Sequence, residues 1–245
     1  MPTERDNGPA SNPMMPPPER GGTVGNIAVL CDFDDTVAVE NVAHLVLDRF
    51  ARAEWRTLIK QFHDGTIIPK EYFERPFRSV RESKEAIQAH VRQTAHLRDG
   101  FGEMARYCQQ RGIELAIVTH GLDFYVEALL EREGLAWLPT YPVGARFTPQ
   151  GIQFEYRYTK PGCDDWGNCK CSVVDRYLSA GKRVFYVGDG LSDFCPARKA
   201  ELVFARTRLL ELCQKEGLPH REFRDFTDVV RELERYSMRP NPLSL

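Results

Sequence analysis

The 245-residue chain lacks a long apolar run, and no stretch approaches the roughly 20 consecutive apolar residues that a membrane-spanning helix needs. It also lacks an excess of charge of either sign, because 33 Lys and Arg face 35 Asp and Glu, for a formal net charge of −2. No overall electrostatic field therefore recruits nucleic acid or an anionic membrane. These absences argue against a membrane protein and against a general nucleic-acid binder.

The chain has seven cysteines, and an odd count in a chain of this size does not favour a disulfide framework. Together with the lack of a secretory signal, they predict reduced thiols in the cytoplasm. Cys163, Cys169 and Cys171 form a C-x₅-C-x-C pattern that raises the possibility of zinc. The spacing matches no standard zinc pair and a fourth ligand is not evident. We interpret these residues as small thiols that pack a loop against a sheet.

Residues 1–26 are rich in proline and glycine and predict a disordered tail, and residues 237–245 predict a second loose tail. Between them, four short apolar segments are typical of buried strands, at residues 27–33, 113–121, 183–190 and 201–206. Helical patterns occupy most of the intervals, and residues 140–160 show β-type alternation. The alternation of strands and helices predicts an α/β fold with a doubly wound parallel sheet and right-handed crossovers.

Polar residues end three of these strands: Asp32 and Asp34 after the first, Thr119-His120-Gly121 at the second, and Asp189 at the third. Because the carboxyl ends of parallel strands share one edge, these residues are expected to meet in a crevice. Carboxylates that lie so close repel one another unless a hard cation such as Mg²⁺ sits among them.

The other polar residues fit a phosphate beside that cation. Thr119 offers a hydroxyl, His120 and Gly121 offer backbone N–H groups near a helix start, and Lys170 offers a positive charge. A carboxylate nucleophile with a second carboxylate as acid and base is suited to hydrolysis through an acyl-phosphate.

The segments DFDDT, VTHG, NCKCS and GDGLSD resemble, in this order, the four motifs of the haloacid dehalogenase-like phosphatases. Over about residues 27–230 the chain resembles the phosphoserine-phosphatase-like branch, and most of all its methionine-salvage phosphatases. The resemblance implies Mg²⁺-dependent hydrolysis of a small phosphorylated metabolite through an aspartyl-phosphate. The implied substrate is 2-hydroxy-3-keto-5-methylthiopentenyl-1-phosphate.

The resemblance also implies a role for each acidic residue. Asp32 would be the nucleophile and a metal ligand, and Asp34 would be the general acid and base, with its backbone carbonyl on the metal. Asp189 would complete the metal site, and Asp193 would be a further ligand or a support.

For the rest of the chain, the resemblance places Thr119 and Lys170 on the phosphate. It implies a core formed by residues 27–38 and 99–236. Residues 39–98, which show helical patterns and no convincing strand, correspond to a small helical cap inserted after the first strand.

Two alternatives stay open. Phosphoserine or another small amino-phosphate could be the substrate, in which case Glu40 could meet the substrate amine; otherwise Glu40 is a carboxylate at a helix start. A non-catalytic phosphate-binding regulatory module is the alternative of another class. The sequence does not determine the oligomeric state.

Overall fold

The sheet is organised around its central strand β1 (Ile27–Cys31), which is buried along its whole length. Alternate side chains point to opposite faces, so Val29 belongs to one apolar cluster and Leu30 to another. A strand whose two faces are both buried has to be apolar at every position, and the sequence of β1 is. The computed structural model describes residues 26–52 and 54–237, so the predicted tails lie outside the described residues except for Asn26 and Ser237.

Seven strands of the described chain form one sheet in the order β4-β3-β2-β1-β5-β6-β7. The six that accompany β1 are β2 (Glu114–Leu122), β3 (Thr140–Thr148), β4 (Gly151–Glu155), β5 (Arg183–Gly188), β6 (Leu202–Ala205) and β7 (His220–Glu222). All neighbouring strands are parallel except the β3–β4 hairpin. The strand order reverses at β1, which confirms the predicted doubly wound sheet and places the ligand crevice beyond the carboxyl end of β1.

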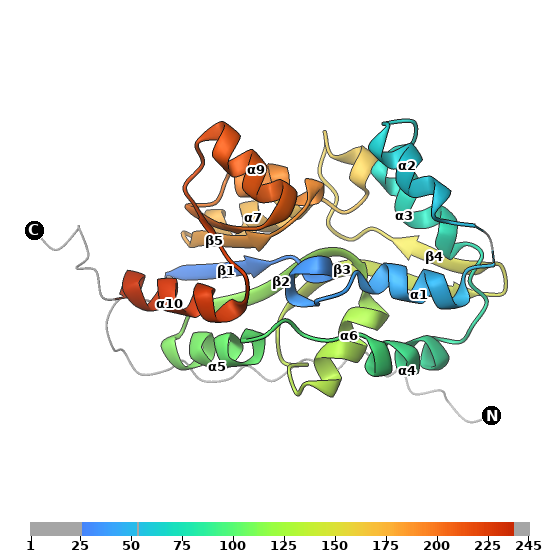
Figure 1. Ribbon diagram of the computed structural model, residues 1–245, viewed down its shortest axis with the longest axis horizontal. Coiled ribbons are helices and arrows are strands. Elements are labelled where there is room, and N and C mark those ends of the chain that lie inside the picture. The colour runs from blue at the N-terminus through green and yellow to red at the C-terminus, as the bar shows by residue number, and fades with distance from the viewer. Residues whose placement is uncertain (1–25, 53, 238–245) are drawn as a thin grey trace, which may run out of the picture.

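Helices cover both faces of the sheet (Figure 1). They are α1 (Val42–Phe50), α2 (Thr57–His63), α3 (Pro69–Phe77), α4 (Lys84–Thr94), α5 (Phe101–Arg111), α6 (Asp123–Arg132), α7 (Lys170–Ser179), α8 (Phe194–Ala197), α9 (Thr207–Glu216) and α10 (Phe226–Ser237). In the view of Figure 1, α4, α5, α6 and α10 lie below the sheet, and α7 and α9 lie above it. Within the described part of the chain, no helix has the length and apolar character to span a bilayer.

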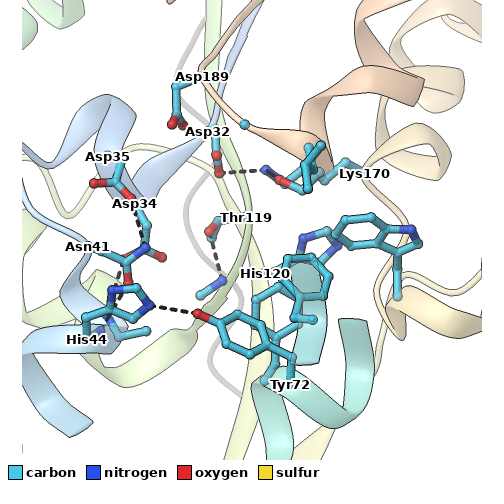
Figure 2. Close-up of a pocket in the computed structure, with 18 of the residues that line it drawn as sticks. Asp32, Asp34, Asp35, Asn41, His44, Tyr72, Thr119, His120, Lys170 and Asp189 are labelled. Atoms are coloured by element: carbon cyan, nitrogen blue, oxygen red, sulfur yellow. Dashed lines mark hydrogen bonds and ion pairs between the residues drawn. The ribbon is translucent and has the colours of Figure 1, made fainter. Parts of the chain in front are cut away.

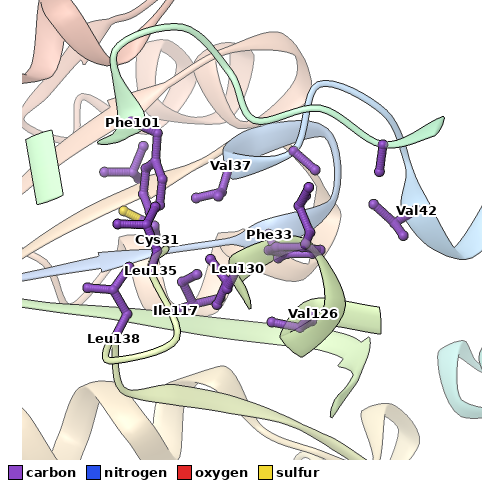
Figure 3. Close-up of a cluster of buried hydrophobic side chains, with 14 of the residues drawn as sticks. Cys31, Phe33, Val37, Val42, Phe101, Ile117, Val126, Leu130, Leu135 and Leu138 are labelled. Carbon is purple, nitrogen blue, oxygen red and sulfur yellow. The ribbon is translucent and has the colours of Figure 1, made fainter. Parts of the chain in front are cut away.

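The larger apolar cluster fills the space between the sheet and the helices below it (Figure 3). Cys31 and Ile117 contribute to it from β1 and β2, Phe101 from α5 and Leu130 from α6, and all four are fully or almost fully buried. Each large side chain buried in this way stabilises the fold by about 1.5–3 kcal/mol. The cluster therefore gives the strand ends a rigid base.

Residues 39–98 contain α1 to α4 and, among their described residues, no strand, apart from an isolated bridge between Ala38 and Leu97. Helix α4 packs against α6, and α1 packs against α4. Helix α3 contacts α2, β4 and the short turn Asp164–Trp166. The predicted helical content is present, whereas the division into a core and a cap stays a prediction.

The sequence pattern does not predict β7 or α9. Strand β7 consists of three polar residues at the sheet edge, so apolar periodicity gives no signal for it. Residues 191–200 belong to the intervals with a helical pattern, but the chain there forms a turn at Leu191–Asp193 and then only the four-residue α8.

Cys171 and Cys195 form a disulfide that links α7 to α8, with Cα atoms 6.2 Å apart. The expectation of uniformly reduced thiols is therefore wrong for this pair. Cys163 and Cys169 are free thiols. Among the described residues, the group of side chains placed to hold a metal ion contains no cysteine.

Candidate active site

Asp32 directly follows β1, and its backbone N–H still bonds the carbonyl of Val187 in β5 at 2.9 Å. Its carboxylate therefore projects from the carboxyl ends of two adjacent strands. Asp32 Oδ1 accepts a hydrogen bond from the backbone N–H of Phe33 and lies 2.7 Å from Lys170 Nζ. Figure 2 shows the two side chains facing each other. Lys170 is the first residue of α7, and its side chain is only 2% exposed.

Asp193 fixes this lysine from the opposite side. Its Oδ1 lies 2.8 Å from Lys170 Nζ and accepts a hydrogen bond from the Tyr186 hydroxyl at 2.7 Å. Its Oδ2 accepts from the backbone N–H groups of Asp189 and Gly190, at 3.0 Å each. Burial alone would raise the pKa of Asp193, but Lys170 and these donors hold it below its ordinary value. Asp193 thus anchors the lysine and the loop that carries Asp189.

Three carboxylates converge here, since oxygen atoms of Asp32, Asp189 and Asp193 lie within 4.8 Å of one another. Lys170 supplies one positive charge against three negative ones. Burial first, and then the charge of Asp193, raise the pKa of Asp32 well above its ordinary value and that of Asp189 to about 7. A divalent cation relieves such repulsion, and oxygen ligands suit Mg²⁺. The residues present therefore fit a magnesium ion.

Asp34 lies in the turn after β1, where Asp35 adopts a φ of 61° and redirects the chain toward α1. Asp34 Oδ1 accepts hydrogen bonds from the backbone N–H groups of Val42 at 2.7 Å and Ala43 at 3.3 Å, which begin α1. The hydroxyl of Tyr125 donates to Oδ2 at 3.3 Å. Burial, and then the charge of Asp35, raise the pKa of Asp34 to about 6 despite these donors. Asp34 is thus able to exchange a proton near neutral pH.

The end of β2 brings the Thr119 hydroxyl and the His120 imidazole to the cavity that holds these carboxylates. Thr119 Oγ1 accepts a hydrogen bond from the Gly121 N–H at 2.8 Å, which leaves its own proton free to donate. His120 Nε2 donates to the Asn168 carbonyl at 2.8 Å, and its Nδ1 is buried without a partner. Burial, and then Lys170, lower the pKa of His120 to about 3, so its ring is neutral. Because Thr119 occupies the Gly121 N–H, that group is not free to bind an anion as expected.

One cavity of about 390 Å³ collects most of the predicted site residues. It is lined by Asp32, Asp34, Thr119, His120, Gly121, Lys170 and Asp189. Asp193 lies behind this lining and is fully buried. Glu40 is not part of the lining, because its carboxylate accepts hydrogen bonds from the backbone N–H of His96 at 2.9 Å and from its Nδ1 at 2.8 Å. The structure does not place Glu40 where it would meet a substrate amine.

Sequence reasoning missed the aromatic side chains that complete the cavity: Phe62, Tyr72, Phe73 and Trp166. They come from α2 and α3 and from the turn before α7, which lies far from these two helices in the sequence. In the sequence their spacing looks like that of ordinary core residues. Only their location in a predicted cap and a loop could have indicated that they line the cavity.

A buried lysine among carboxylates, at the carboxyl edge of a doubly wound sheet, defines an enzyme site for a cation and an anionic group. The haloacid dehalogenase-like hydrolase family matches residues 29–198 of this sequence. The chain belongs to this family, as the resemblance of its four motifs predicted.

Relatives with curated descriptions extend this result. The chain is 31% identical over 214 residues to a 2-hydroxy-3-keto-5-methylthiopentenyl-1-phosphate phosphatase of Brevibacillus brevis, covering 85% of this chain and 95% of that one. It is 32% identical to the phosphatase of the same name from Geobacillus kaustophilus, covering 85% and 96%. A solved phosphoserine phosphatase, captured as an analogue of its phospho-aspartyl intermediate, aligns with a TM-score of 0.65. That alignment has 19% identity and covers 84% of this chain and 98% of the other, so it shows a shared fold.

Proposed function

We propose that the protein hydrolyses a small phosphomonoester in two steps, with Asp32 as the nucleophile. The observation that carries this proposal is the convergence of Asp32, Lys170 and Asp189 at one end of the cavity, with Asp34 lining the same space. Lys170 and the Phe33 N–H both contact Oδ1 of Asp32. No donor among the described residues is bonded to the other carboxylate oxygen, Oδ2. Oδ2 is therefore the atom that we propose attacks phosphorus.

In the first step, an Asp32 carboxylate oxygen forms a bond to phosphorus while the bond from phosphorus to the ester oxygen breaks. Asp34 donates its proton to the departing alcohol oxygen, which its pKa of about 6 permits near neutral pH. Lys170 and the free hydroxyl proton of Thr119 bind the phosphoryl oxygens.

In the second step, water attacks phosphorus, Asp34 accepts the water proton, and the bond from phosphorus to Asp32 breaks to release phosphate. Asp32 and Asp189, with the Asp34 carbonyl, would hold the Mg²⁺ ion, which supplies charge neutralisation for the phosphoryl group. Asp193 supports this arrangement through Lys170 and the Asp189 backbone, because all of its hydrogen bonds are made within the protein.

For the substrate, we propose 2-hydroxy-3-keto-5-methylthiopentenyl-1-phosphate, the compound after which the two relatives are named. Phosphoserine is less well supported, because Glu40 binds His96 instead of facing the cavity. The family and the paired Asp32 and Asp34 favour catalysis over a phosphate-binding regulatory module. We also propose that residues 39–98 act as the cap and that the protein works in the cytoplasm.

Hydrolysis of p-nitrophenyl phosphate tests the chemistry. The wild type with Mg²⁺ should release p-nitrophenol steadily, whereas Asp32→Asn should lose nearly all activity because the amide is a poor nucleophile. Asp34→Asn should keep its fold and lose much of the rate. Equal rates in the wild type and Asp32→Asn would end the proposal of a covalent nucleophile.

A further inference from the structure

Aromatic side chains form one wall of the cavity, which we call the aromatic wall: Phe62, Tyr72, Phe73, His120 and Trp166. Figure 2 shows Tyr72 and His120 at the end of the pocket away from Asp189. All five side chains are half-buried, unlike the fully buried core residues. Each therefore keeps part of its surface free to contact a ligand in the cavity.

The rings of the aromatic wall support one another. His120 stacks on Phe73, at a centroid distance of 5.4 Å, and on Trp166, at 5.2 Å. Phe73 and Trp166 also contact each other, with their ring centroids 6.4 Å apart. Phe62 stacks on Tyr72 at 4.8 Å, and it meets Trp166 edge-on at 6.4 Å. Because α2, α3, the end of β2 and the turn before α7 all contribute, the wall is a composite surface and not the apolar stripe of one helix.

Polar groups of the aromatic wall are mostly satisfied within the protein. The Tyr72 hydroxyl lies 2.8 Å from His44 Nε2, and the His120 Nε2 proton goes to the Asn168 carbonyl. Burial lowers the pKa of both histidines, which favours the uncharged form of their rings. The wall therefore offers a ligand an apolar and uncharged surface.

The lysine and arginine of the cavity lining, Lys170 and Arg208, lie outside the aromatic wall. Lys170 is held between Asp32 and Asp193. Arg208 is exposed on α9 beside Thr207, whose hydroxyl bonds the Asp189 carbonyl, so it belongs to the acidic end. A substrate carboxylate, such as that of phosphoserine, would meet no opposite charge on the aromatic wall and would lose its hydration there.

We infer that the aromatic wall binds the alcohol portion of the substrate and selects phosphomonoesters in which that portion is uncharged and apolar, such as a short alkyl or thioether chain. Aromatic rings suit such groups through apolar contact and, for sulfur, through sulfur–ring contact. Trp166 and Phe62 are the specificity-determining residues, because their rings line the cavity and meet edge-on where α2 and the turn before α7 come together. This inference rests on the proposed function and assigns its substrate class to particular residues.

The test compares pentyl phosphate, O-phosphoserine and methyl phosphate, whose single carbon offers little surface to pack. The wild type should prefer pentyl phosphate to phosphoserine by about 100-fold or more in kcat/KM, since an unpaired charge is rejected strongly. Trp166→Ala should lower kcat/KM for pentyl phosphate about 10- to 100-fold, mainly through KM, and leave methyl phosphate nearly unchanged. Trp137→Ala is the matched control, because Trp137 is 46% exposed and lies outside the cavity.

Two results overturn the inference: a wild type that hydrolyses phosphoserine as well as pentyl phosphate, or a Trp166→Ala variant that slows pentyl and methyl phosphate equally. Hydrolysis of methyl phosphate reports the proposed chemistry separately, and also reports whether a variant is folded. Binding of pentylphosphonate, measured by calorimetry, gives a readout without turnover. Binding that Trp166→Ala weakens and Trp137→Ala does not, in a protein that hydrolyses no ester, would support the aromatic wall and refute the proposed function.

Discussion

Lys170 Nζ lies 2.7 Å from Asp32 Oδ1 in a setting where the two side chains are only 2% and 9% exposed. The same ammonium lies 2.8 Å from the fully buried Asp193. A charge pair at this depth is costly to form and still more costly to break, because the remaining partner is left unpaired. Lys170 therefore links the stability of the fold to the chemistry proposed at Asp32.

Replacing Lys170 by Met should lower the free energy of unfolding by about 3–5 kcal/mol, because two buried carboxylates lose their cation. It should also abolish most phosphatase activity. Urea unfolding and a p-nitrophenyl phosphate assay measure the two effects. Lys199→Met is the control: Lys199 pairs with Asp175, but the two side chains are 31% and 34% exposed, so the loss of this cation should cost less than about 1 kcal/mol. Equal losses in the two variants would contradict a special role for Lys170.

Magnesium should raise the melting temperature of the wild type, because the ion binds the folded carboxylates and not the unfolded chain. The folded-state pKa of Asp189 is raised to about 7, so below that pH a proton competes with the metal. The shift in melting temperature should therefore be larger at pH 8 than at pH 5.5, and EDTA should reverse it. In Asp189→Asn the shift should be much smaller. A shift independent of pH, or unchanged in Asp189→Asn, would show that the ion binds elsewhere.

His120 should make the fold sensitive to mild acid. Its folded-state pKa is lowered to about 3, whereas the unfolded value is near 6.5, so the unfolded chain binds a proton first as pH falls. Its contribution is complete above about pH 6.5 and decreases toward pH 3. Between pH 7 and pH 4.5, the wild type should lose about 2.5 kcal/mol relative to His120→Phe, which keeps an aromatic ring in the stack. Parallel stability curves for the two proteins would contradict a buried, neutral imidazole.

Gly121 should be needed for the position of Asp34. A Cβ atom at Gly121 would lie 2.7 Å from the Tyr125 hydroxyl and 3.0 Å from Asp34 Oδ2, so Gly121→Ala has to displace one of them. We expect kcat to fall about 10- to 100-fold with a smaller change in KM, since a displacement of about 1 Å is enough for such a loss. Gly190→Ala is the control within the same cavity, because a Cβ there meets nothing within 4 Å. Similar kinetics for the two variants would argue against a precisely placed Asp34.

Much of this architecture follows from local sequence patterns. Continuous apolar segments predict β1, β2, β5 and β6, and the rule for parallel sheets then brings Asp32, Thr119 and Asp189 together. These predictions succeed because a central strand is buried on both faces and tolerates few polar residues.

Other features depend on contacts that local patterns do not encode. The partner of Glu40 is His96, at the far end of the predicted cap. Phe62 and Trp166 meet across α2 and the turn before α7, so their joint role emerges only after folding. Cys171 and Cys195 are brought together by the packing of α7 on α8, and cysteine counting gave the opposite expectation.

Capture of the phosphoryl group by Asp32 can be tested by trapping the phosphorylated protein. The wild type is mixed with ³²P-labelled phosphomonoester and Mg²⁺, quenched with acid within one turnover, and digested for peptide mapping. If Asp32 is the nucleophile, the label will lie on the peptide that contains Asp32, will be released by hydroxylamine as expected for an acyl-phosphate, and will be absent from Asp32→Asn. Phosphate release from the wild type without any protein-bound label, or label on another residue, would contradict it.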